Sequence, residues 1–320
     1  MVHRGELNVQ FMIGNSSHWP LVSIVSVNFN QPVVTGELIE SLTKITYPAI
    51  EVIVVDNGST VGNLEEIVQK YSTVKLIKSD VNLGFAGGNN LGIRQAAGDY
   101  ILLLNNDTLV EPGFLEPLVE KCRRNQSIGV VSPKIYFSHT PGLLQYTGFS
   151  EISTFTTRSI GWGCGMKDEN QFEEDRETFF GHGAAMLVPR HVIEKVGLMA
   201  EIFFLYYEEM DWCKRIRNAG YKIFYVHNSV VYHKESVSTG KDSPAKTYYL
   251  NRARILYMRR NVRGIKSLIA FAYQAIVAIP KNLLVFAIQG KFHHLAAYCK
   301  AILWNVKTAA SLQIHHNPYL

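Results

Sequence analysis

Cysteine is scarce in this sequence and forms no recognisable motif. The 320 residues include four cysteines, at positions 122, 164, 213 and 299, and no two of them make a CxxC pair. Scattered cysteines of this kind favour reduced thiols in a cytosolic compartment. The first 20 residues also lack the apolar core of a signal peptide. We therefore expect residues 1–20 to be a loosely structured lead-in to a cytoplasmic protein.

Two glycine motifs of nucleotide-binding proteins are missing. A dinucleotide-binding domain needs GxGxxG directly after its first strand, where this chain reads NFNQPVV at residues 28–34. The P-loop pattern GxxxxGK[ST] is absent as well. These absences argue against hydride transfer and P-loop hydrolysis. A nucleotidyltransferase that makes sugar nucleotides would need a glycine- and arginine-rich loop at the same position, and it stays only as an alternative.

Acidic residues are absent from the last part of the chain. No Asp or Glu follows Asp242, and the last 78 residues hold 11 Lys and Arg. The other 21 of the 32 basic side chains and all 27 acidic ones lie in the first 242 residues, which have a net charge of −6. An acidic body with a basic, acid-free tail indicates two regions that face different surroundings.

Apolar runs long enough to cross a membrane are also lacking in this tail. Residues 268–279 and 283–288 are apolar, but Pro280 separates them and neither reaches the roughly 20 residues that span a bilayer. We expect residues 246–320 to form a basic, apolar helical tail, peripheral on the cytosolic face of an anionic membrane. Packing against a partner subunit in a homo-oligomer is the alternative. No nucleic-acid motif accompanies the basic residues, so no nucleic acid is expected as a partner.

Apolar runs alternate with helical segments over the first 110 residues. The pattern predicts strands at residues 21–29, 50–55, 74–77 and 100–104, and helices at 33–43, at 63–71 and before residue 98. This alternation is typical of an α/β fold with a mostly parallel, doubly wound sheet. Further strands are predicted at 179–189 and 221–232, whereas residues 132–177 look irregular.

Polar side chains end three of the predicted strands. The first strand ends in Asn28 and Asn30, the second in Asp56, and the fourth, GDYILLLNNDTLV at residues 98–110, in Asn105, Asn106 and Asp107. Because the carboxyl ends of parallel strands meet at one edge of a sheet, a ligand site is expected there. A carboxylate with amide neighbours suits Mg²⁺ or Mn²⁺. For each strand end taken alone, a plain polar turn is the alternative.

Seven motifs follow one another between residues 22 and 262: SIVSVNFN, VVDNGST, NLGFAGGNN, LLLNNDT, GHGAAMLVPR, FFLYYEEMDWCKR and AGYKIFYVHNSVVYH. Their order resembles the inverting, family-2 glycosyltransferases with the Rossmann-like GT-A fold, in particular the rhamnosyltransferase-like branch of bacterial polysaccharide synthesis. The resemblance implies a glycosyltransferase domain over residues 21–245. Residues 21–131 would be its nucleotide-sugar half and residues 132–245 its acceptor and catalytic half.

The resemblance also implies roles for individual residues. The metal ion that bridges the donor's phosphates would be held by Asp107, by Asn105 at a position where the family more often has Asp, and by His233. Asp56 would pair with the donor base. The other residues expected at the nucleotide-sugar donor are Asn28, Asn30, Asn82, Gly87, Gly88, Asn89 and Asn106.

An acidic cluster, Glu208, Glu209 and Asp211, opens a predicted helix at residues 210–219. Carboxylates there are favoured by the helix dipole alone. In the family that the chain resembles, the matching acids supply the catalytic base, which takes the proton of the acceptor hydroxyl. Glu209 is the aligned residue, Glu208 the fallback, and Asp211 better suited to holding the helix start. A lone histidine such as His182 is more often structural than catalytic.

Together these features predict a metal-dependent inverting glycosyltransferase. It would move a sugar from a nucleoside-diphosphate sugar, dTDP-rhamnose or a UDP-sugar, to a glycan or lipid-linked acceptor in cell-surface polysaccharide synthesis. A non-catalytic, membrane-associated protein that binds sugar nucleotides or assists assembly is the second alternative.

Overall fold

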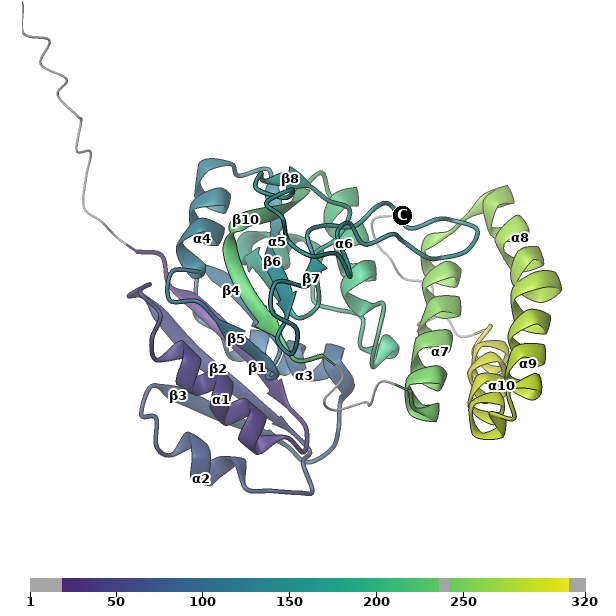
Figure 1. Cartoon of the computed structure of the whole chain (residues 1–320), viewed down its shortest axis with the longest axis horizontal. Helices are drawn as coiled ribbons and strands as arrows, with labels where there is room; N and C mark the ends of the chain where they lie inside the picture. The colour runs from purple at the N-terminus through teal and green to yellow at the C-terminus, as the bar shows by residue number, and fades with distance from the viewer. Residues whose placement is uncertain (1–18, 236–241, 311–320) are drawn as a thin grey trace, which may run out of the picture.

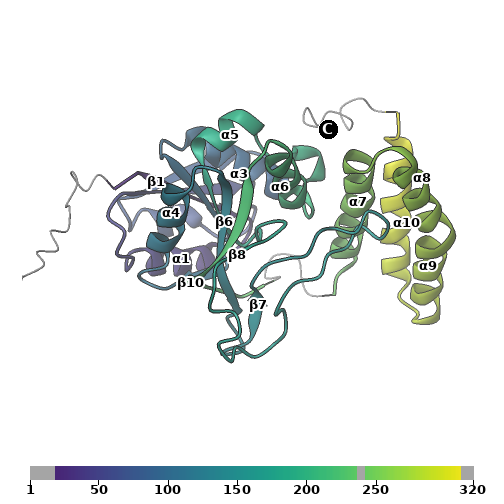
Figure 2. The same ribbon diagram turned by 90° about the horizontal axis from the view of Figure 1, so that it is seen from above.

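The computed structural model describes residues 19–235 and 242–310 of the chain. Most of the predicted lead-in (1–18), residues 236–241 and the end of the tail (311–320) lie outside the described residues. One ten-stranded sheet with helices on both faces forms the larger part of the molecule. Four helical segments at the C-terminal end stand beside it as a separate layer (Figures 1 and 2).

The sheet has the strand order β3-β2-β1-β4-β9-β6-β10-β5, with β7 paired to β6 and β8 to β10. The strands are β1 (Val22–Asn28), β2 (Ile50–Asn57), β3 (Val74–Ser79), β4 (Tyr100–Leu104), β5 (Thr108–Val110), β6 (Ile128–Phe137), β7 (Leu144–Tyr146), β8 (Arg176–Glu177), β9 (Ala185–Pro189) and β10 (Lys222–His233). The strands β1 to β4 pair with one another in parallel, and β6 pairs with β10 in parallel. β9 runs antiparallel to both β4 and β6, between which it lies. The predicted mostly parallel α/β sheet is therefore confirmed, with antiparallel insertions in its second half.

Helices cover both faces of the sheet because successive strand side chains point to opposite sides. Ile24 of β1 packs in the apolar cluster under α1 (Pro32–Leu42), α2 (Leu64–Val68) and α4 (Leu115–Arg124). Its neighbour Val25 packs in the opposite cluster, under α3 (Gly84–Gln95), α5 (Arg190–Val196) and α6 (Glu208–Asn218). Runs of wholly buried residues in β1 and β4 are what a strand covered on both faces requires.

The prediction that residues 132–177 are irregular is wrong at its start. Residues 132–137 belong to the long central strand β6, whose pattern is interrupted in the sequence by Ser132, Pro133 and Lys134. Lys134 is buried nevertheless, and its ammonium forms an ion pair with Asp168 at 3.1 Å. Tertiary pairing thus allows a charge in a central strand. The loop between β7 and β8 does lack long regular elements, as expected, and it reaches out toward α7 (Figures 1 and 2).

The tail folds as α7 (Pro244–Asn261), α8 (Gly264–Tyr273), a π-helical turn (Gln274–Ala278), α9 (Ile279–Ile288) and α10 (Phe292–Lys307). The prediction that Pro280 divides the apolar stretch is wrong. The π-helical turn precedes Pro280 and the helix continues through it, so that one apolar helix spans Gly264–Ile288. The helix has 25 residues, and an 18-residue stretch of it has a mean hydropathy of 1.6, enough to cross a membrane by length and composition alone. One such helix in the described part of the chain is weak support for a membrane span.

Candidate active site

The turn after β4 brings Asp107 against the end of β10. Strand β5, which follows the turn, pairs antiparallel with β10 so that His233 lies opposite Thr108. As a result His233 Nε2 lies 3.1 Å from Asp107 Oδ1, and both side chains are nearly buried. The amide of Asn105 lies 3.5 Å from the same imidazole nitrogen. The structure therefore brings together all three residues that were predicted to hold a metal.

Gln145 on β7 orients this histidine. Its Oε1 lies 2.8 Å from His233 Nδ1, and because an amide oxygen only accepts, the hydrogen on Nδ1 is donated to it. The lone pair of Nε2 then faces the Asp107 carboxylate, an arrangement that needs a proton or a cation between the two acceptors. A divalent metal fits this donor set, and an outer partner such as Gln145 is the usual companion of a ligating histidine.

The described residues contain no group of three His, Cys, Asp or Glu side chains placed to hold a metal. Asn105 occupies the position of a third acid. The protein thus offers two strong ligands and one amide, and a bound metal would take its other ligands from substrate or water. Gln145 was missed by the sequence reasoning because it lies in the stretch that looked irregular.

Glu209 lies at the start of α6, close to Gly183, which precedes the residue bonded to Asn105. A Cβ placed on Gly183 would lie 3.8 Å from the Glu209 carboxyl carbon. The next residue, Ala184, accepts a hydrogen bond from the backbone N–H of Asn105 at 2.9 Å. The glycine leaves room in front of the carboxylate, and the segment Gly183–Ala184 links it to the metal motif. The predicted base and the predicted metal-ligand turn therefore both contact the segment Gly183–Ala184.

Burial raises the pKa of Glu209 to about 7. Burial, followed by the charge of Glu209, raises the pKa of Glu208 well above its usual range. Among the described residues neither Glu208 Oε2 nor Glu209 Oε2 has a hydrogen-bond partner. Glu208 is 3 % exposed and Glu209 is partly exposed as a residue, but the Oε2 atom of each carboxylate is buried.

Asp211 has a structural place instead. It is fully buried, and its carboxylate accepts from Arg260 at 3.0 Å, Arg215 at 3.2 Å and Asn261 at 2.9 Å. Arg260 and Asn261 belong to α7, so Asp211 joins that helix to α6. Every oxygen of this carboxylate is occupied, which leaves none for an acceptor hydroxyl.

His182 packs close to His233, with ring centroids 5.9 Å apart, and stacks on Phe149. Its Nδ1 accepts from the backbone N–H of Ala184, so the ring presents Nε2–H to its surroundings. Burial, then the neighbouring His233, lowers the pKa of His182 to about 3. It is therefore a neutral imidazole, held in the wall of the site.

On the donor side, Asp56 ends β2 directly beside Asn28 of β1. Asn28 is fully buried and donates to Asp56 Oδ1 at 3.3 Å. Its own Oδ1 accepts from Thr35 at 2.9 Å, and Thr35 in turn accepts from Asn106 at 3.0 Å. A chain of hydrogen bonds thus joins the turn at Asn106 to Asp56, the carboxylate expected to pair with the donor base. Asn28 and Asn106, which were predicted to contact the donor, form hydrogen bonds with Asp56 and Thr35 in this chain. Thr35 carries no sequence signal that would have identified it.

Three more predicted donor residues also hold the backbone. Asn30 accepts from the N–H groups of Thr60 and Val61, at 2.8 and 3.0 Å. Asn82 accepts from the N–H of Gly84 at 2.8 Å, and Asn89 donates to Phe85 O at 2.9 Å.

The glycine-rich segment serves close packing rather than an open phosphate loop. Helix α3 begins at Gly84, so Gly87 and Gly88 lie inside its first turns. A Cβ on Gly88 would come within 2.8 Å of Val27, and one on Gly92 within 2.3 Å of Val25. The missing side chains of Gly88 and Gly92 let α3 lie against β1.

The backbone before Glu209 is strained. Phe204, Tyr206 and Tyr207 all have positive φ, between 65° and 69°, an uncommon conformation for aromatic residues. The N–H of Phe85 donates to the carbonyl of Phe204 at 2.6 Å, which ties this loop to the start of α3. Such strain persists only where the surroundings hold it, and it clusters at functional sites.

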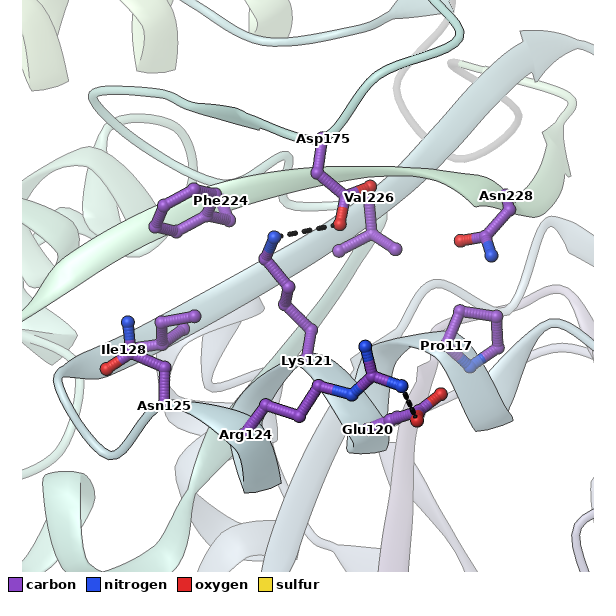
Figure 3. A pocket seen from close by; sticks show the side chains of 10 residues that line it. All are labelled: Pro117, Glu120, Lys121, Arg124, Asn125, Ile128, Asp175, Phe224, Val226 and Asn228. Carbon is purple, nitrogen blue, oxygen red and sulfur yellow. Dashed lines mark hydrogen bonds and ion pairs between the residues drawn. The ribbon is translucent and has the colours of Figure 1, made fainter. Parts of the chain in front are cut away.

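A separate cavity of about 250 Å³ between α4 and β10 contains none of these residues (Figure 3). Its lysine, Lys121, is paired with Asp175 at 2.9 Å, and Arg124 is paired with Glu120. His227, the other histidine of β10, also bonds to Asp175, at 2.8 Å. The charged side chains that line this cavity are already paired with one another.

Comparisons with known proteins identify the family and the fold. The family model described as glycosyl transferase family 2 matches residues 23–197, more than half of the chain. An N-acetylglucosaminyl-diphospho-decaprenol L-rhamnosyltransferase of Mycobacterium tuberculosis is 27 % identical over 242 residues, covering 69 % of this chain and 78 % of the relative. A low-salt glycan biosynthesis hexosyltransferase of Haloferax volcanii is 27 % identical over 239 residues, covering 72 % of each.

Solved structures share the fold at low identity. A mannosyltransferase of Pyrobaculum calidifontis, in complex with GDP-Man and Mn²⁺, superposes with a TM-score of 0.56 at 16 % identity, covering 95 % of this chain and 83 % of that one. GalNAc-T7 with UDP, GalNAc and Mn²⁺ gives a TM-score of 0.64 at 15 % identity, covering 93 % and 59 %. The GT-A fold is thereby confirmed. The chain belongs to glycosyl transferase family 2 and is a glycosyltransferase.

Proposed function

We propose that this chain is a metal-dependent, inverting glycosyltransferase that uses a nucleoside-diphosphate sugar. One observation carries the proposal: Asp107 with His233, and Glu209 with its raised pKa, lie on two sides of the segment Gly183–Ala184. A cation-binding pair and a carboxylate near neutrality are what transfer of a sugar from a diphosphate to a hydroxyl requires.

Glu209 would act as the general base. A base works best when its pKa lies near the operating pH, because it is then deprotonated and still takes a proton readily. As the acceptor oxygen attacks the anomeric carbon, its proton passes to the Glu209 carboxylate. The bond from that carbon to the donor phosphate breaks, and the nucleoside diphosphate leaves with the electron pair. Attack opposite the leaving group inverts the anomeric centre.

Asp107, His233 and Asn105 would hold Mg²⁺ or Mn²⁺, which when bound neutralises charge on the departing diphosphate. Asp56 would accept from the ring N–H of a uracil or thymine base. Asn28 supports that role, because its hydrogen bond keeps the Asp56 carboxylate at the strand end.

The donor we infer is dTDP-rhamnose or a UDP-sugar, and the acceptor a glycan or lipid-linked sugar of cell-surface polysaccharide synthesis. The name of the mycobacterial relative, a rhamnosyltransferase acting on a diphospho-decaprenol sugar, supports this choice. The relative's acceptor carries a polyprenyl lipid. This agrees with a place on the cytosolic face of the membrane, with the domain of residues 21–245 in the cytosol and the tail at the lipid surface.

The test is binding and turnover of a panel of nucleotide sugars with Mg²⁺ or Mn²⁺. Wild type should bind one donor in a metal-dependent way. Asp107→Ala should abolish that binding, whereas Glu209→Gln should bind the donor and turn over at least about 100-fold more slowly, as expected for loss of a general base. Glu194→Gln, an exposed carboxylate on α5, is the matched control and should behave as wild type.

If wild type binds no donor with either metal, the proposal fails, and the non-catalytic alternative takes its place. If Glu209→Gln keeps full turnover, Glu209 is not the base.

A further inference from the structure

A second polar cavity lies between the tail helices and the loop that follows β7. Its volume is about 290 Å³, and it contains none of the residues placed at the active site. Arg158 enters it from the loop, Asp242 and Lys246 from the start of α7, Arg254 from the middle of α7, and Asn282 and Phe286 from α9. Three cationic side chains and one carboxylate thus face the same space.

The one carboxylate is already neutralised by other groups. Asp242 forms an ion pair with Lys291 at 2.8 Å and lies 3.7 Å from His294. Within the described ranges no ion pair joins Arg158 or Arg254 to an acid. The cavity also faces the N-terminus of the 18-residue helix α7, where Ser243 is the N-cap. A helix N-terminus carries partial positive charge, so the cavity as a whole favours an anion.

Arg254 is held in place by uncharged groups. Its Nε donates to the Tyr207 hydroxyl at 3.1 Å, and its Nη1 donates to Asn251 at 3.3 Å. These bonds fix the planar guanidinium without supplying a negative charge. A fixed guanidinium is suited to a phosphate, which it can bind through two parallel hydrogen bonds.

The cavity is also connected to the catalytic loop. The Tyr207 hydroxyl that accepts from Arg254 donates to the carbonyl of Thr157 at 2.8 Å, next to Arg158. Tyr207 lies two residues before Glu209, in the strained segment. An anion bound by Arg254 would therefore be connected, through the Tyr207 side chain, to the loop that carries the proposed base.

An unpartnered apolar surface adjoins the cavity. Asn282 and Phe286 belong to the apolar helix Gly264–Ile288. Only 11 % of the most apolar 18-residue stretch of this helix is buried. Its exposed side chains include Ile265, Leu268, Ile269, Ile276, Leu284 and Ile288. In both views this helix lies on the outer side of the tail layer, away from the sheet (Figures 1 and 2). A basic, acid-free tail with such a surface is suited to an anionic lipid.

We propose that this cavity binds the phosphate or diphosphate of a lipid-linked acceptor, while the acceptor's hydrocarbon chain lies along the helix Gly264–Ile288. The inference rests on the proposed function, since it names the acceptor's anionic group and gives it a site of its own. The sugar attached to that phosphate would then extend past Tyr207 toward Glu209.

The test uses the double variant Arg158→Gln/Lys246→Gln, which removes two cationic groups of the cavity and leaves Arg254 and its bond to Tyr207 in place. Lys300→Gln is the control, because Lys300 is an exposed cation on α10 outside the cavity. Binding of farnesyl diphosphate to the full chain is measured by calorimetry with a chelator present, so that the metal-dependent donor site does not take the probe. Farnesol, which has no phosphate, is the comparison ligand.

Wild type and the control should bind farnesyl diphosphate with similar affinity, and the double variant at least tenfold more weakly. In turnover assays the double variant should show a raised KM for a lipid-diphosphate acceptor at nearly unchanged kcat. Equal binding by all three proteins would overturn the proposal. Binding to phosphatidylglycerol vesicles is measured as well. If the double variant binds these vesicles more weakly but binds farnesyl diphosphate as wild type does, the proposal is overturned and the cavity is assigned to phospholipid headgroups.

Nucleotide-sugar binding with Mn²⁺ is measured in parallel and should be the same in all three proteins. If wild type binds no donor but still binds farnesyl diphosphate through Arg158 and Lys246, the proposed function fails and the lipid-phosphate site stands. The two failures are thus distinguishable.

Discussion

Replacing Asp211 by asparagine should damage stability rather than catalysis. The side chain keeps its size but loses its charge, and two buried arginines, Arg215 and Arg260, lose their counter-ion. Removing one partner of a buried ion pair costs about 3–5 kcal/mol, because the remaining charge is left uncompensated. At about 2–4 °C per kcal/mol for domains of 150–250 residues, the expected drop in Tm is roughly 6–20 °C.

The assay compares urea and thermal unfolding of wild type, Asp211→Asn, Glu209→Gln and the surface control Glu194→Gln. The control should stay within about 0.5 kcal/mol of wild type. Folded Asp211→Asn, assayed well below its Tm, should retain most of its turnover. A variant of wild-type stability with turnover reduced 100-fold would refute this reasoning and place Asp211 among the reacting groups.

Three further outcomes are expected. Because burial raises the pKa of Glu209 to about 7, turnover should fall below that pH as the base is protonated. The same shift means that folding stability is lost as pH rises from the ordinary carboxyl range through about 7, and Glu209→Gln should show a smaller loss, with the part due to Glu208 remaining. Asn105→Asp should bind Mn²⁺ at least about tenfold more tightly without donor, as measured by electron paramagnetic resonance, because the site gains a carboxylate ligand; unchanged affinity would remove Asn105 from the metal site. Gly92→Ala should lower the free energy of unfolding by about 1–3 kcal/mol, because its Cβ would meet Val25 at 2.3 Å, and a neutral effect would show that α3 can move away from β1.

The fold was predictable where burial is continuous. The strand at residues 100–104 was predicted with the bounds that β4 has, because five buried residues between Asp99 and Asn105 leave little choice. Strand β6 was missed because Pro133 and Lys134 interrupt its apolar pattern, and ion pairs with Asp168 and Glu173 make the buried Lys134 acceptable there.

Within the site, position in the chain was easier to predict than role. Asp107 and His233 were expected together, and they are in contact. Asn28 and Asn30 were expected at the donor; both side-chain polar atoms of Asn28 and the Oδ1 of Asn30 form hydrogen bonds with neighbouring protein groups. Residue type says what a side chain can bond to, but the fold decides which partners lie within reach.

The sequence by itself determined the sheet class and the family, and it predicted the acids and the histidine of the candidate site. These follow from local patterns, from strand ends that must meet at one edge of a parallel sheet, and from the order of the motifs. Only the tertiary structure decided that the Asp211 carboxylate is fully paired while Glu209 Oε2 has no hydrogen-bond partner among the described residues, and that Gln145 fixes the tautomer of His233. The physical reason is that burial and hydrogen-bond partners depend on residues far apart in the chain, such as Asp211 with Arg260, whose approach no local pattern records.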